Sequence, residues 1–97
     1  MEPSFKITGK LWIYPGMGAW HFLTVDKKTS KTIKSITGHL RRGFGSLKIS
    51  AQVGKTKWQT SIFPTKDGEF LLPVKNSVRK VENLLADKKT TIQITII

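Results

Sequence analysis

The chain has 97 residues, enough for a single domain with a modest hydrophobic core, and we treat 1–97 as one domain. It contains no cysteine, which excludes disulfides, thiolate metal sites and cysteine nucleophiles. Seventeen Lys and Arg against six Asp and Glu give a net charge of +11, a field that attracts nucleic acid and other polyanions.

The charge also has an ordinary explanation. Fourteen of the seventeen cations are Lys, which commonly solvates the outward faces of strands and protects their edges, whereas specific phosphate contacts favour Arg. The amino terminus has no basic segment followed by an apolar run, and no apolar stretch approaches the roughly 20 residues that cross a bilayer. We therefore expect a cytoplasmic protein with no signal peptide and no transmembrane segment.

The chain begins with two predicted strands. Residues 5–14 alternate between apolar and polar side chains, a pattern that predicts a strand with one buried face. Residues 15–18 interrupt it with Pro and Gly, which favour a turn. Residues 19–25 are apolar on both faces, and we expect this second strand to be covered on both sides.

A helix is predicted over 27–37. Asp26 is placed to cap its first turn with a carboxylate, and Gly38 is a natural stop. Its apolar positions are Ile33 and Ile36.

Further elements follow, separated by Gly, Asp and Asn turn signals. They are a strand over 46–53, a turn at Gly54-Lys55, a strand ending at Pro64, a hairpin turn at Asp67-Gly68, a strand over 69–74, a helix and a last strand through Ile96. Asn76 or Ser77 is expected to cap the helix. Its apolar stripe consists of Val78, Val81, Leu84 and Leu85.

The two halves of the chain resemble each other. Apolar and proline residues recur at an ungapped offset of 49, pairing Ile13 with Ile62, Pro15 with Pro64, Leu23 with Leu72 and Val25 with Val74. Such self-similarity indicates one supersecondary unit used twice.

The repeat predicts the architecture. Half one, about 5–53, and half two, about 54–97, each contain strand, strand, helix and strand. We predict a mainly β fold, a small six-stranded pseudo-twofold β-barrel with two α-helices, in which closure removes exposed edges. Residues 5–37 should superpose on residues 54–86.

Several motifs resemble a known bacterial family. They are Trp20-His21-Phe22, Arg41-Arg42-Gly43-Phe44-Gly45-Ser46, Trp58 and Leu71-Leu72-Pro73-Val74-Lys75. Over roughly 5–97 the chain is similar to the DUF1905 family, which has no established activity. The resemblance implies a double-split β-barrel, the fold of AbrB-type and MazE-type transcription factors, which bind DNA as dimers of half-barrels. The high positive charge is not typical of the family, so a charge-based function would be this chain's own.

A loop present in only one half is the first candidate site. It contains Arg41, Arg42, Gly43, Phe44 and Gly45. Backbone N–H groups at the two glycines, with the arginines beside them, could cradle a phosphate, and the aromatic ring could stack on a base. The alternative is a bulged start to the third strand, with Phe44 closing the barrel end.

Other candidates carry less chemistry. His21 and His39 could serve acid–base catalysis, but a histidine between Trp20 and Phe22 is more typical of packing. Two histidines and six scattered carboxylates do not predict a metal site. The tryptophans at 12, 20 and 58 could line a ligand pocket, although core packing is the commoner role.

We therefore predict a non-enzymatic basic module that binds an anionic partner, nucleic acid first, without a cofactor. The binding residues would be Arg41, Arg42 and the cations on one face of the first helix, Lys27, Lys31 and Lys34. Secondary candidates are His21, Lys75 and Arg79. The alternative is a small-ligand pocket or weak enzyme at the barrel mouth, using His21 and Arg41. We expect a monomer or a weak homodimer.

Overall fold

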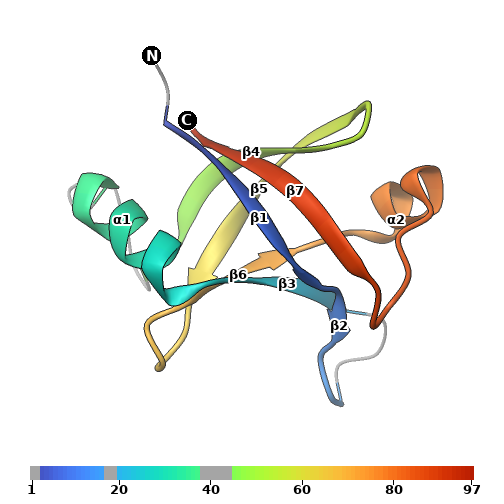
Figure 1. Cartoon of the computed structure of the whole chain (residues 1–97), viewed down its shortest axis with the longest axis horizontal. Coiled ribbons are helices and arrows are strands. Elements are labelled where there is room, and N and C mark those ends of the chain that lie inside the picture. The colour runs from blue at the N-terminus through green and yellow to red at the C-terminus, as the bar shows by residue number, and fades with distance from the viewer. Residues whose placement is uncertain (1–2, 17–19, 38–44) are drawn as a thin grey trace.

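The computed structural model describes residues 3–16, 20–37 and 45–97. Within these residues seven strands and two helices are formed (Figure 1). The strands are β1 (Ser4–Lys10), β2 (Trp12–Ile13), β3 (His21–Val25), β4 (Leu47–Val53), β5 (Thr56–Pro64), β6 (Phe70–Pro73) and β7 (Lys89–Ile96). The helices are α1 (Lys27–Thr37) and α2 (Asn76–Glu82).

The strands form one antiparallel sheet in the order β1-β7-β4-β5-β6-β3-β2. Its two outer strands, β1 and β2, are consecutive in the chain, so the sheet curls until its ends nearly meet (Figure 1). The helices lie on opposite sides of this barrel-like sheet. A mainly β, barrel-like fold with two helices is thus confirmed.

The number of strands was predicted wrongly, because the expected strand over 5–14 is divided at Leu11. The Leu11 N–H donates to the Lys88 carbonyl at 3.1 Å, and its carbonyl accepts from the Asp87 N–H at 2.7 Å. Before this residue the chain pairs with β7, and after it the chain pairs with β3. Period-two alternation cannot reveal a change of partner, so seven strands replace the predicted six.

The pairing order is symmetric between the two halves of the chain. The β1–β7 pair corresponds to β5–β4, and the β2–β3 pair corresponds to β5–β6. At the centre of β3 and β6, Leu23 pairs directly with Leu72, its partner in the 49-residue offset. A twofold relation would produce this register, but pairing order alone does not establish that the halves superpose.

The ungapped offset is not kept in the first strand of each half. Ile13 pairs with His21, and Pro64 pairs with Phe70, so Ile13 and not Pro15 occupies the position that corresponds to Pro64. Pro15 lies instead in an exposed turn after β2. Aligning the halves on their pairing therefore shifts this strand by two residues.

The core is built from the inward faces of the strands. Leu72 and Ile94, on two different strands, have no exposed surface. Other fully buried aliphatic side chains come from both halves: Leu11, Leu23, Val25, Ile33, Ile49, Ile62 and Ile92. The predicted turn at Gly54-Lys55 joins β4 to β5, and Gly54 adopts a φ of 57°, which suits glycine. Ser4 pairs with Thr95, so the start of β1 adjoins the end of β7 (Figure 1).

Helix α1 has the predicted bounds and the predicted cap. The Thr29 N–H donates to the Asp26 carboxylate at 3.1 Å. Hydrogen bonding to Thr29 lowers the pKa of Asp26 below the usual 3.8. The Thr29 side chain has the larger effect and its backbone N–H the next. Ile33 is buried as expected, whereas Ile36 is 41% exposed. Its place toward the core is taken by the small polar residues Ser30 and Thr37.

Helix α2 departs further from expectation. Lys75, with extended backbone and no side-chain capping bond, occupies the N-cap, so neither Asn76 nor Ser77 is the cap. The helix stops after Glu82 because Asn83 turns left-handed, with φ of 55°. The predicted apolar stripe is broken: Leu84 and Leu85 lie beyond the helix, and within it Val78 is buried but Val81 is 72% exposed. Neither described helix is long and apolar enough to span a membrane.

Candidate functional site

The predicted binding residues do not form one described site. Arg41, Arg42, Gly43 and Phe44 lie outside the described residues, as does His39. Gly45 is half-buried just before β4, with φ of 86°. Lys27 and Lys31 are exposed on α1. Lys34 is half-buried, with its ammonium 5.6 Å from the centroid of the Phe70 ring.

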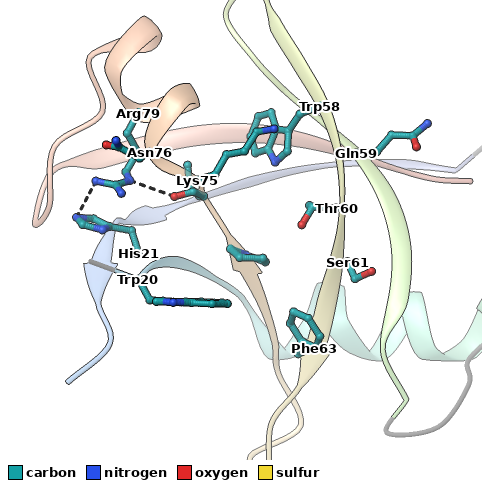
Figure 2. Close-up of a pocket in the computed structure, with 12 residues that line it drawn as sticks. Trp20, His21, Trp58, Gln59, Thr60, Ser61, Phe63, Lys75, Asn76 and Arg79 are labelled. Carbon is teal, nitrogen blue, oxygen red and sulfur yellow. Dashed lines mark hydrogen bonds between the residues drawn. The ribbon is translucent and has the colours of Figure 1, made fainter. Parts of the chain in front are cut away.

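The three secondary candidates, in contrast, come together. His21, Lys75 and Arg79 line a pocket of about 790 Å³ between β5 and α2 (Figure 2). The other lining residues are Trp20, Trp58, Gln59, Thr60, Ser61, Phe63, Pro73, Val74 and Asn76. The pocket adjoins α2, and α1 lies on the other side of the sheet (Figure 1).

The pocket forms where β5 and β6 part. Only Phe63 and Pro64, the last two residues of β5, pair with β6, while the strand from Thr56 onward pairs with β4. The β4–β5 turn has two residues, so Val53 and Thr56 form the first hydrogen-bonded pair of the ladder. Alternation along the strand then directs the backbone groups of Gln59 and Ser61 away from β4. One wall of the pocket is therefore a strand edge with peptide donors and acceptors.

The opposite wall carries positive charge from α2. The Arg79 Nε donates to the Val74 carbonyl at 3.1 Å, and its Nη1 lies 3.4 Å from His21 Nε2 (Figure 2). Since a guanidinium can only donate, His21 Nε2 is the acceptor in this contact. These contacts fix Arg79 against β3 and the end of β6. Lys75 is exposed, and its side chain extends toward the Trp58 ring (Figure 2).

Aromatic rings border the pocket. Trp58 is only 7% exposed and packs into the core, whereas Trp20 is 53% exposed and Phe63 is 41% exposed. Trp20 also belongs to an aromatic cluster formed with Trp12, Tyr14 and Phe22, and its ring centroid lies 5.8 Å from that of Phe22. Trp12, in the same cluster, does not line the pocket; its indole donates to Thr24 Oγ1 at 2.9 Å. The three tryptophans therefore have three different environments.

This combination favours an anionic ligand. Among the described residues that line the pocket, two are permanent cations and none is Asp or Glu. The described residues contain no group of three or more His, Cys, Asp or Glu side chains that could hold a metal ion. The pocket walls present positive charge, a peptide edge and aromatic faces.

Sequence reasoning missed most of this pocket. Gln59 and Ser61 were predicted only to lie within a strand ending at Pro64, because the alternation pattern does not show where pairing ends. One available signal was the pair Ser30 and Arg79, which occupy matching positions in the repeat. A serine in one copy and an arginine in the other marks a place where the two halves differ in charge and size.

Comparison with known proteins identifies a family. The family model described as Domain of unknown function (DUF1905) matches residues 8–94, which is most of the chain. No curated protein matches the chain significantly.

Proposed function

The chain belongs to the DUF1905 family, whose description names no activity. We propose that the domain is a non-enzymatic module that binds an anionic ligand in the pocket between β5 and α2. The observation that carries the proposal is the placement of Lys75 and Arg79 in a concave site whose described lining has no acidic residue. A cation at a concave, partly desolvated site attracts an anion more strongly than one on a flat surface.

The fold proposed with this function is a duplicated double-split barrel. The direct pairing of Leu23 with Leu72 supports a twofold relation. The pocket lies where the sheet splits between β5 and β6, so the splitting itself creates the binding site. Nucleic acid stays the expected macromolecular partner, and the exposed Lys27 and Lys31 on α1 would add to its general attraction.

The test is a titration of the protein with pyrophosphate, followed by amide chemical shifts in NMR. Hydrogen bonds to charged groups contribute about 1.5–3 kcal/mol, so Lys75→Gln and Arg79→Gln should each weaken binding roughly 10- to 100-fold. Lys75 is exposed and makes no capping bond, so its replacement should leave the fold intact.

The matched control is Lys31→Gln, which removes the same charge from α1. We expect it to change affinity by less than about threefold, as general screening of a remote charge would. Equal losses from Lys31→Gln and Lys75→Gln would mean that the positive field is diffuse and that no pocket site exists.

A further inference from the structure

We propose that the ligand of this pocket is a nucleotide unit, with its base along the open edge of β5 and its phosphate at Lys75 and Arg79. This inference rests on the proposed anion-binding function and names the ligand class. A nucleotide unit joins a planar ring, hydrogen-bonding groups on the ring edge, and a phosphate. The pocket presents a partner for each of these three parts.

The edge of β5 matches the first requirement, recognition of a base edge. The backbone groups of Gln59 and Ser61 face the pocket, and each residue offers one N–H donor and one C=O acceptor. Residues two apart on a strand are separated by about 6.6 Å. A base edge is narrower than this spacing, so one base would use the N–H and C=O of a single residue, either Gln59 or Ser61, which point to the same side of the strand.

The length of the open edge discriminates against a peptide strand. At one end, the Thr56 hydroxyl donates to the Glu82 carboxylate at 2.6 Å, which ties α2 to the strand. At the other end, Phe63 pairs with Leu71 of β6. Between these ties the pocket is lined from Trp58 to Ser61, a stretch of about 10 Å at 3.3 Å per residue. A strand added here would have about four residues at most, fewer than the usual five to six, whereas one base needs less than this length.

The two exposed aromatic rings and the two basic side chains lie on different sides of the pocket. Trp20 and Phe63 are on one side, while Lys75 and Arg79 are on the side of α2 (Figure 2). A base stacked on Trp20 would therefore have its sugar and phosphate directed toward the cations. The pocket volume of about 790 Å³ lies within the range that holds a drug-sized ligand.

The unit could come from a free mononucleotide or from the end of an oligonucleotide, and the probes distinguish the two sources. We would titrate the full chain with adenosine 5′-monophosphate, adenosine, inorganic phosphate, and a single-stranded hexanucleotide with and without a 5′-phosphate. Tryptophan fluorescence gives the affinity, and amide shifts of Gln59 and Ser61 locate the base.

The expected result is that adenosine 5′-monophosphate binds at least tenfold more tightly than adenosine or inorganic phosphate. If the 5′-phosphorylated hexanucleotide binds more tightly than the mononucleotide, the source is a nucleic-acid end; the reverse order indicates a free nucleotide. Trp20→Ala should weaken nucleotide binding by about 5- to 150-fold, as loss of base stacking does, and leave phosphate binding unchanged.

A proline scan tests the strand edge. Ser61→Pro removes a peptide N–H that faces the pocket and spares those that pair with β4, so it should weaken nucleotide binding more than Lys57→Pro. Lys57 has the same orientation by alternation but does not line the pocket. If Ser61→Pro prevents folding, Trp20→Ala still decides the question, because Trp20 is more than half exposed.

Three outcomes would overturn the inference in distinguishable ways. Inorganic phosphate binding as tightly as the nucleotide would leave the anion-binding function in place and remove the nucleotide. An acidic peptide that binds with amide shifts along Lys57–Ser61, when nucleotides do not bind, would also remove it. If no anion binds the pocket at low salt, the proposed function fails together with the inference.

Discussion

Ser30 on α1 and Arg79 on α2 occupy matching positions at two helix–strand junctions, yet one junction is closed and the other borders a pocket. The Ser30 hydroxyl donates to the Val25 carbonyl at 3.0 Å and accepts from the Phe70 N–H at 3.0 Å. Arg79 makes the corresponding contacts to the Val74 carbonyl and to His21. Each helix is thus tied to the strand before it and to the strand across the sheet.

The difference in size between these two side chains changes what the junction can do. Ser30 is fully buried, and Phe70 beside it is fully buried as well. Arg79 is only half-buried, and it holds His21 at the wall of an open pocket. The comparison teaches that one scaffold can make the same tie with a hydroxyl or a guanidinium, and that the guanidinium adds charge to the wall of the pocket formed where β5 and β6 part.

The largest expected effect concerns three fully buried residues of the core, Leu23, Leu72 and Ile94. Leu23 and Leu72 face each other with no exposed surface. Leu23→Ala, Leu72→Ala and Ile94→Ala should each lower the free energy of unfolding by about 2–5 kcal/mol, because each leaves a cavity in a close-packed core. Urea unfolding measures the change. A normal midpoint for any of the three would mean that its strand face is assigned backwards, and very unequal values for the two leucines would weaken the twofold relation.

The second prediction compares the ties themselves. Ser30→Ala leaves the buried Phe70 N–H without its hydroxyl partner and should cost about 1–3 kcal/mol of unfolding free energy. Arg79→Gln alters a half-exposed contact and should cost less, about 0.5–1.5 kcal/mol. Thermal unfolding of both variants gives the order.

Thr32→Ala is the control for the second prediction, since the Thr32 hydroxyl donates to the Lys28 carbonyl at an exposed position of the same helix. Its loss should be almost neutral. If Arg79→Gln proves more destabilising than Ser30→Ala, the main role of the guanidinium would be to stabilise the fold, and its role in binding would need separate proof.

The smallest effect concerns the helix starts. Asp26→Ala removes a capping carboxylate and should cost about 0.5–2 kcal/mol at neutral pH, whereas Lys75→Ala at the uncapped start of α2 should cost little. The pKa of Asp26 is lowered on folding, so its charge stabilises the fold at pH values above the unfolded value near 3.8. That contribution is lost as the pH falls through the folded pKa.

Chemical denaturation at several pH values between neutral and about 2.5 measures this dependence. The difference in stability between the parent and Asp26→Ala should shrink as the solution becomes more acidic. A difference that stays constant or grows on acidification would show that the carboxylate charge is not what caps α1.

Local signals in the sequence were sufficient for most element bounds. Asp26 marks the start of α1 and Gly54-Lys55 identifies the β4–β5 turn, because capping and turn chemistry act between near neighbours. The alternation that ends in Ile92, Ile94 and Ile96 likewise predicted a strand with one buried face, and all three are buried.

The remaining features depend on contacts between distant segments. β1 ends before Leu11 because the Leu11 backbone forms hydrogen bonds with residues 87 and 88, and no residue near Leu11 in the sequence predicts these bonds. The pocket exists because pairing between β5 and β6 stops at Phe63, while His21 and Arg79 meet across 58 residues of chain. The resemblance to a family predicted a barrel-like fold correctly, but a family of unknown function could not indicate which surface would bind a ligand.

The adjoining ends of β1 and β7 have a mechanical consequence. Ser4 pairs with Thr95 and Lys10 pairs with Lys89, so the two ends leave the fold side by side from one antiparallel ladder. Tension applied through both ends would load this ladder one residue pair at a time, as in opening a zipper, instead of shearing all its hydrogen bonds together. A tether through these ends would therefore peel β1 away from β7 at low force and open the barrel along that ladder.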